Sequence, residues 1–265
     1  METMDDTASK QVTTAVLLAA GTGSRLQPLT NDAPKCLSEV NGIAILERLV
    51  RCLRSNGFER LIVVVGYLDQ RVRKFLDQWD DELQIDYVIN PVYATTNNLY
   101  SFWLARESIN EPFLLVESDV VFDAALMEDM LQPDKIAVSN MQDWMDGTTV
   151  TVDLFQRVFA FQIGSGGDLG GVRHKTVNMY SFTLASWRRV SERLSQYVAA
   201  GRVNDYYETV FAEMVADGSL SLEAVDFDSG RWYEIDTLED LHEAELMFPG
   251  RPLGGDSLSL AVTTT

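Results

Sequence analysis

Short apolar runs alternate with amphipathic segments along the first half of the chain. The apolar runs have the length of buried strands and lie at residues 15–19, 61–65, 85–89 and 113–116. Between them, apolar side chains recur at helical spacing at residues 45–53, 72–79 and 100–108. Gly57 follows the first of these helical segments as a stop signal. This alternation predicts a series of βαβ units around a mostly parallel sheet.

In open α/β sheets, ligands bind at the edge where the carboxyl ends of the parallel strands meet. Glycine or polar residues come after the predicted strands at Gly21, Gly66-Tyr67, Asn97-Asn98 and Asp119. We therefore expect these positions to converge on one ligand-binding edge.

The segment after the first predicted strand combines glycines with two spaced cations. Gly21 and Gly23 allow positive φ and a close approach of the backbone to a ligand, which leaves amide N–H groups free to point at phosphate oxygens. Arg25 adds a forked donor suited to phosphate, and Lys35 adds a compact charge. Because Leu26 replaces the third glycine of G-x-G-x-x-G, the dinucleotide turn of a dehydrogenase is excluded. The segment predicts a site for a polyphosphate.

Two aspartates are candidates for holding Mg²⁺ near that polyphosphate. Asp119 comes just after the apolar run at 113–116, at the expected ligand edge of the sheet. Mg²⁺ takes one or two carboxylates and completes its shell with phosphate oxygens and water, so we expect a second carboxylate from Asp236. Asp236 ends a short predicted strand at 232–235. It also has a plain interpretation as a helix-start residue, because the T-x-x-D that follows it is typical of a capping box.

Composition mainly excludes classes of function. The net charge of −19 argues against a nucleic-acid partner, because phosphate backbones are bound by excess Lys and Arg. No apolar run approaches the roughly 18 residues of a membrane-spanning helix, so we expect a cytoplasmic protein without membrane insertion. The two cysteines are expected to be free thiols. We expect a single domain over residues 11–248, with flexible tails at 1–10 and 249–265.

Residues 18–35, LAAGTGSRLQPLTNDAPK, resemble the N-terminal motif of nucleotidyltransferases that join a nucleoside triphosphate to a phosphorylated small molecule. The resemblance implies a Rossmann-like, three-layer α/β/α fold with a mixed, mostly parallel sheet. It also implies that Lys35 and Arg25 hold the triphosphate and that Asp119 and Asp236 bind the catalytic Mg²⁺, with Glu234 as the weaker metal candidate. The expected nucleotide contacts are Leu18, Ala19, Ala20, Gly21, Gly23 and Ser24.

Other segments resemble one branch of that family. Residues 90–106, NPVYATTNNLYSFWLAR, and Gly66 to Leu68 resemble cytidylyltransferases that activate phosphocholine and phosphonates. The Q-x-G-x-A-x-A stretch that is usual in the sugar-1-phosphate enzymes is absent. Asn98 and Ser101 are expected to meet the polar edges of a pyrimidine, with Tyr67 packing nearby, which points to CTP. The segments 175–182 and 204–211 resemble the phosphonate-activating branch.

The acceptor subsite has four candidates, each with a plain alternative. Trp144 lies where the resembling phosphocholine enzymes place an aromatic side chain against a quaternary ammonium, but it also fits a core position. Lys175 follows the glycine-rich residues 164–171 and is expected either to close over an anionic acceptor or to be a solvated charge on a mobile hairpin. Tyr207 and Glu208 are expected to meet an amine or hydroxyl of the acceptor, although they also fit an ordinary helix.

The predicted reaction transfers CMP from CTP to a small phosphonate or phosphorylated alcohol, such as 2-aminoethylphosphonate or phosphocholine, and releases pyrophosphate. Lys35, Arg25 and Lys175 are the expected catalytic cations. The nearest alternative is a sugar-1-phosphate uridylyl- or thymidylyltransferase. A glycosyltransferase that uses Glu117-x-Asp119 and a non-catalytic nucleotide sensor are further alternatives. The sequence leaves open which acceptor is used and whether the protein forms a homodimer.

Overall fold

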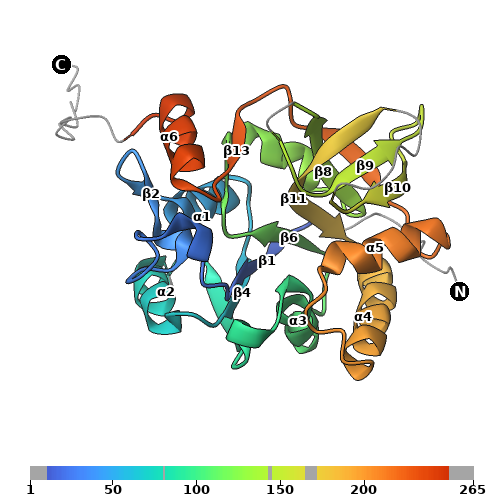
Figure 1. The fold of residues 1–265 in the computed structure, drawn as a ribbon, viewed down its shortest axis with the longest axis horizontal. Helices are drawn as coiled ribbons and strands as arrows, with labels where there is room; N and C mark the ends of the chain where they lie inside the picture. Colours follow the sequence, from blue (N-terminus) through green and yellow to red (C-terminus); the bar gives the residue numbers. More distant parts are fainter. Residues whose placement is uncertain (1–10, 80, 143–144, 165–171, 251–265) are drawn as a thin grey trace, which may run out of the picture.

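The computed structural model describes residues 11–79, 81–142, 145–164 and 172–250, and within them nine strands form one mixed sheet (Figure 1). The strand order is β10-β9-β11-β6-β1-β4-β5, and β8 pairs with both β11 and β12. The strands of this sheet are β1 (Thr14–Ala19), β4 (Arg60–Val65), β5 (Gln84–Ile89), β6 (Phe113–Glu117), β8 (Lys135–Asn140), β9 (Thr149–Val152), β10 (Val158–Gln162), β11 (Arg173–Phe182) and β12 (Glu223–Asp226).

The four strands predicted in the first half of the chain are neighbours in the sheet and run parallel. β1 lies between β4 and β6, and β5 pairs with β4, all in parallel register. β11 then runs antiparallel to β6, β8 and β9, which makes the sheet mixed. The prediction of an α/β fold with a mixed sheet is confirmed.

Six α-helices and six short 3₁₀ segments occur among the described residues. The helices are α1 (Ile45–Ser55), α2 (Asp69–Leu76), α3 (Asn98–Leu104), α4 (Leu184–Ala199), α5 (Tyr207–Ala216) and α6 (Leu238–Met247). The 3₁₀ segments are η1 (Ser24–Leu26), η2 (Lys35–Leu37), η3 (Asp77–Trp79), η4 (Tyr93–Thr95), η5 (Ala105–Glu107) and η6 (Ala124–Met130).

Local residues explain where the predicted helices begin and end. α1 ends at Ser55, and Gly57 adopts the left-handed φ of 78° that the stop signal requires. α3 begins at Asn98, two residues before the predicted start, because the Asn97 side chain accepts a hydrogen bond from the Asn98 amide. The cap, and not the apolar periodicity, therefore sets the first residue of α3.

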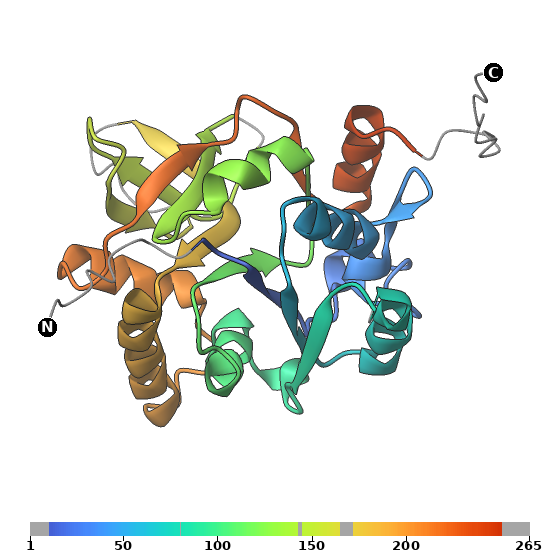
Figure 2. The ribbon, with the colours of Figure 1, turned by 180° about the vertical axis from the view of Figure 1, so that it is seen from behind.

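The sheet is covered by helices on both faces, as the side chains of β1 show. Ala15, Leu17 and Ala19 pack into one buried cluster with residues of α1 and α2. Val16 and Leu18 point the other way, into a second cluster with residues of α3, α4 and α5. These three helices contact one another and lie side by side in both views (Figures 1 and 2). The alternation along one strand therefore produces three layers.

A third buried cluster joins the two ends of the described chain. It combines Leu26 of the first loop with Val121, Ile235 and Phe248 from far along the sequence. Outside the main sheet, β7 (Val120–Phe122) pairs with β13 (Trp232–Glu234), and β2 (Glu39–Val40) pairs with β3 (Ile43–Ala44). Figure 1 shows α6 beside β2, in agreement with their contacts. This packing holds the loop that follows β1 and contains Gly21 and Gly23, called the glycine-rich loop below, against β13 and α6.

Two further findings concern the composition-based expectations. Cys36 and Cys52 are both free and buried. Within the described part of the chain, no helix has both the length and the apolar character needed to cross a membrane.

Candidate active site

In the loop after β1, side chains pack closely against Gly23. Gly23 has a φ of 61°, and a Cβ placed on it would lie 3.0 Å from Cβ of Lys35 and 3.1 Å from Cγ2 of Thr30. The Thr30 hydroxyl donates a hydrogen bond of 2.8 Å to the Gly23 carbonyl oxygen. A residue with a side chain at this position would therefore be strained and would push on Lys35.

Tyr67 supports this loop from outside the cavity. Its hydroxyl lies 2.9 Å from the carbonyl oxygen of Thr30 and 2.8 Å from that of Asn31. Tyr67 is not among the residues that line the first of the two cavities described below. The structure therefore places it against the loop backbone rather than in the position expected for packing near a base.

The two aspartates are brought together by the pairing of β7 with β13. The amide of Ile235 donates a hydrogen bond of 2.9 Å to the carbonyl oxygen of Asp119. Asp236 follows directly, and α6 begins with the predicted capping box formed by Thr237 and Asp240. The Asp240 carboxylate also accepts the Asp236 amide at 3.0 Å, so the cap fixes the backbone of Asp236. Asp236 therefore both lies at the start of α6 and belongs to the site.

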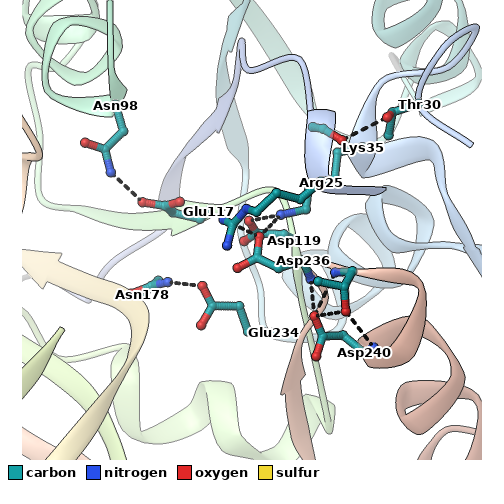
Figure 3. Close-up of polar contacts among 12 residues, drawn as sticks. Arg25, Thr30, Lys35, Asn98, Glu117, Asp119, Asn178, Glu234, Asp236 and Asp240 are labelled. Carbon is teal, nitrogen blue, oxygen red and sulfur yellow. Dashed lines mark hydrogen bonds and ion pairs between the residues drawn. The ribbon is translucent and has the colours of Figure 1, made fainter. Parts of the chain in front are cut away.

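Lys35 lies between both carboxylates (Figure 3). Its Nζ is 2.7 Å from Oδ2 of Asp119 and 2.5 Å from Oδ1 of Asp236, and Nη2 of Arg25 is 2.8 Å from the same Asp236 oxygen. Burial alone would lower the pKa of Lys35, but the two carboxylates outweigh this and raise the pKa above its ordinary value. Lys35 therefore carries a full positive charge, and the structure brings all four predicted residues together.

A cavity of about 290 Å³ opens along this cluster. Its lining includes the loop residues Leu18, Ala20, Gly21, Gly23, Ser24, Arg25 and Lys35, the polar residues Asn90, Asn98 and Ser101, and Glu117, Asp119 and Asp236. Within this lining, the Ser101 hydroxyl accepts a hydrogen bond of 3.1 Å from the side-chain amide of Asn90, and Asn90 is itself buried. Ala19 does not line the cavity and belongs to the core. Asn90 was missed in the sequence, although it directly follows a predicted strand.

A second cavity, of about 330 Å³, adjoins the first and shares Arg25, Asn98, Glu117, Asp119, Tyr206 and Asp236 with it. Its further lining includes Lys175 and Asn178 of β11, Glu208 of α5 and Glu234 of β13. Asn178 has a φ of 57°, and the register of β11 against β8 shifts around it. This irregularity places the Asn178 amide 2.9 Å from Glu234 (Figure 3).

Lys175 is buried and fixed, which corrects the interpretation of it as a solvated charge on a mobile hairpin. Only 4% of its surface is exposed, and its Nζ donates to Glu234 at 2.9 Å and to the Thr176 carbonyl oxygen at 2.9 Å. Burial raises the pKa of Glu234, and the Lys175 charge opposes that rise. Most of the glycine-rich segment before it, residues 165–171, lies outside the described residues, as does Trp144.

Asn98 lines both cavities and is also hydrogen-bonded to protein groups, so its contact with a pyrimidine stays a prediction. Its amide nitrogen donates to Glu117 at 3.0 Å, and its oxygen accepts the Tyr207 amide at 3.1 Å. The Tyr207 hydroxyl donates to the same Glu117 oxygen at 2.8 Å. Tyr207 is fully buried and lines neither cavity, so the expected contact with an acceptor is wrong for this residue.

Two glutamates line the second cavity near its boundary with the first: Glu117 is partly buried and lines both cavities, and Glu208 is buried and lines the second. Burial, with the nearby charge of Asp119, raises the pKa of Glu117 well above its ordinary value. Burial raises the pKa of Glu208 to about 7. The sequence held a signal for Glu117, because it directly follows the apolar run at 113–116 and precedes the segment that carries Asp119, at the expected ligand edge. It was considered only as part of an acid-x-acid motif.

Comparisons with known proteins agree with this geometry. Residues 15–167 match the family described as MobA-like NTP transferase domain. CMP-5'-(3-aminopropyl)phosphonate synthase of Streptomyces rubellomurinus is 32% identical over 245 residues, which are 88% of this chain and 38% of that protein. The chain thus spans less than half the length of this relative. 2-Aminoethylphosphonate cytidylyltransferase of Lancefieldella rimae is 25% identical, over 88% of this chain and 92% of that protein.

A solved structure shares the fold. CTP:phosphocholine cytidylyltransferase from Streptococcus pneumoniae superposes with a TM-score of 0.76 at 20% identity, over 89% of this chain and 98% of that chain. The resemblance to nucleotidyltransferases, and to their phosphonate and phosphocholine branch, is confirmed by these matches. The chain therefore belongs to the family of MobA-like NTP transferase domains.

Proposed function

We propose that the protein transfers CMP from CTP to a small phosphonate or phosphorylated alcohol and releases pyrophosphate. The observation that carries this proposal is the pair of adjoining cavities that share Arg25, Asp119 and Asp236. A nucleotide in the first cavity and an anionic acceptor in the second would meet at these residues. Relatives named for CMP transfer to phosphonates support the choice of reaction.

The first cavity has the features of a nucleotide triphosphate site. The backbone of Gly21 and Gly23 can approach phosphate oxygens closely, and Lys35 and Arg25 supply the positive charge. Ser101, held by the buried Asn90, offers a polar edge to the base. In this proposal Asn98 meets the base and also holds Glu117, and Tyr67 fixes the loop.

Asp119 and Asp236 fit a magnesium ion. Oδ1 of Asp119 is buried and has no hydrogen-bond partner among the described residues, so it is available to a ligand. Mg²⁺ takes one or two carboxylates and completes its shell with phosphate oxygens and water, which this pair of aspartates can provide together with a bound triphosphate. When bound there, Mg²⁺ would offset the negative charge of the triphosphate. Lys35 would then turn from the carboxylates toward the phosphates.

The reaction brings two anions together, so the protein has to supply positive charge that offsets their repulsion. It does not need a general base. An oxygen of the acceptor phosphonate attacks the α-phosphorus of CTP in line, and the bond to the pyrophosphate oxygen breaks. Because the acceptor oxygen is already ionised near neutral pH, no proton needs to be removed. Lys35 and Arg25 stabilise the charge that grows on the leaving pyrophosphate, and Lys175 is placed for the acceptor.

The test is a panel of pyrophosphate-release assays on the full chain. CTP, UTP, dTTP and ATP are each combined with 2-aminoethylphosphonate, 3-aminopropylphosphonate, phosphocholine and glucose 1-phosphate, with Mg²⁺ present. The proposal predicts that CTP with a phosphonate or phosphocholine gives the fastest release. Faster release from UTP or dTTP with glucose 1-phosphate would assign the chain to the sugar-activating enzymes instead.

Three broader expectations accompany this proposal. Residues 11–248 act as one catalytic domain, with 1–10 and 249–265 as its tails. The enzyme works in the cytoplasm, where CTP is available. A homodimer stays a prediction, and size-exclusion chromatography with light scattering tests it.

A further inference from the structure

The second cavity holds more carboxylates than the described cations pair with. Six acidic side chains line it: Glu117, Asp119, Asp146, Glu208, Glu234 and Asp236. Lys35 pairs with Asp119 and Asp236, and Lys175 pairs with Glu234. Asp146 is exposed to solvent. Glu117 and Glu208 remain, and no ion pair to either is found within the described part of the chain.

These two glutamates differ in how their oxygens are satisfied. Oε1 of Glu117 accepts hydrogen bonds from Asn98 and Tyr207. Glu208 is 95% buried, as only 5% of its surface is exposed, and its Oε2 has no hydrogen-bond partner among the described residues. A buried carboxylate oxygen without a partner is costly to the folded protein. Such a group at a cavity wall is therefore suited to a ligand that brings its own positive charge.

The chemistry around Glu208 distinguishes between kinds of cation. A primary ammonium has three N–H donors, so it can hydrogen-bond to several oxygens at once. A quaternary ammonium has none and is favoured by aromatic faces. The described lining of this cavity contains one aromatic side chain, Tyr206, which is half exposed, whereas it contains several acceptor oxygens.

We infer that the acceptor carries a primary ammonium group at the end opposite its phosphonate or phosphate, and that Glu208 accepts a hydrogen bond from it. This inference rests on the proposed function and narrows its acceptor class. The anionic end of the acceptor faces Lys175 and Arg25, and the cationic end faces Glu208 and Glu117. Both ends of the molecule are then matched by charge within one cavity.

The experiment compares three acceptors that differ only in their head group. Full-length protein is assayed by pyrophosphate release with CTP, Mg²⁺ and 3-aminopropylphosphonate, 3-(trimethylammonio)propylphosphonate or butylphosphonate. The inference predicts a kcat/KM for the primary amine about 10- to 100-fold above those of the other two, because a hydrogen bond to a charged group is lost in each of them. Glu208→Gln should lower kcat/KM for the primary amine more than tenfold and so remove most of this preference.

Glu213→Gln is the matched control, because Glu213 lies on the same helix but is exposed and lines neither cavity. It should keep the full preference. Equal kcat/KM for the amine and butylphosphonate, or a higher value for the trimethylammonio compound, would overturn this inference while leaving the proposed function standing. No pyrophosphate release with CTP and any acceptor would overturn both. If Glu208→Gln fails to fold, the ranking of the three acceptors on the unmodified protein decides.

Discussion

Lys35 is the residue on which most of the site's charge depends. Its side chain is mostly shielded from solvent between Asp119 and Asp236, and it lies at the end of the loop that follows β1. Lys35→Ala should lower the rate of pyrophosphate release from CTP by at least about a hundredfold, because loss of one group that stabilises growing charge typically costs about 3 kcal/mol. Circular dichroism should show an intact fold. Lys74→Ala, on the exposed side of α2, is the control and should keep full activity.

Glu208 gives a prediction about stability and pH. Its pKa rises from 4.5 in the unfolded chain to about 7 in the fold, so the folded state holds this proton more strongly. Its contribution to the free energy of unfolding therefore falls as pH rises from 4.5 to 7. Glu208→Gln removes that dependence, so the variant should gain up to about 3 kcal/mol relative to the unmodified protein between pH 4.5 and pH 8.

Urea unfolding at several pH values measures this difference. Glu117, Glu234 and Lys175 face the same region, so only the difference between variant and unmodified protein reports on Glu208. Glu213→Gln, on the exposed side of the same helix, should show no comparable trend. A constant difference across the pH range for Glu208→Gln would contradict the burial argument.

At the scale of single residues, the sequence predicted best those whose chemistry is fixed by local motif. The glycines, Arg25, Lys35, Asp119 and Asp236 lie together as expected. The burial of Tyr207 was missed because its partners, Asn98 and Glu117, lie far from it in sequence. Long-range hydrogen bonds of this kind leave no local pattern, and a polar residue near a ligand edge can serve the protein instead of the ligand.

At the scale of elements, the glycine-rich loop is constrained by Gly23. Gly23→Ala should weaken CTP binding, because the new Cβ would meet Lys35 and Thr30 in addition to the strain of a positive φ. Gly57→Ala has a similar φ of 78° and open space around it, so it should cost about 1 kcal/mol of stability without changing CTP affinity. Calorimetric titration with CTP and thermal melting separate the two effects. Equal CTP affinities for both variants would contradict the role given to this loop.

The capping box of α6 gives a second prediction about an element. Thr237→Ala should lower the free energy of unfolding by about 1 kcal/mol and also reduce the rate, because the cap holds the backbone of Asp236. Thr183→Ala removes the side-chain cap of α4, and Thr183 is absent from the linings of both cavities. It should cost stability and leave the rate unchanged. A matching loss of rate in both variants would show that the cap does not position Asp236.

The elements themselves were predictable where hydrophobic pattern and stop signals agreed. β1, β4, β5 and β6 follow apolar runs, and Gly57 marks the end of α1. The antiparallel half of the sheet was not predicted, since β11 pairs with three strands and shifts register at Asn178. Which strands pair across such distances depends on tertiary packing and is not encoded in any one segment.

At the scale of the whole molecule, the third buried cluster connects the glycine-rich loop to β13 and α6. This connection places cations from the start of the chain against carboxylates from its end, so the site depends on the complete fold. Removal of Mg²⁺ with EDTA should abolish CMP transfer, and Mg²⁺ in excess should restore it, because Asp119 and Asp236 would bind the ion together with the triphosphate. Undiminished transfer in EDTA would contradict the metal proposal.

The molecule has a net charge of −19, and six of its acidic side chains line the second cavity. The overall acidity argued against a nucleic-acid partner, but it did not indicate that six acidic side chains would line one cavity. That information came from the fold, which brings together residues from β6, α5 and β13.

Phosphorus NMR of one reaction mixture tests the central claim most directly. CTP, Mg²⁺ and 3-aminopropylphosphonate are incubated with the full chain, and the phosphorus resonances are followed over time. The account predicts equal amounts of pyrophosphate and of a new product in which phosphonate and CMP phosphorus share an oxygen. Unchanged CTP, or release of inorganic phosphate without the mixed anhydride, would contradict it.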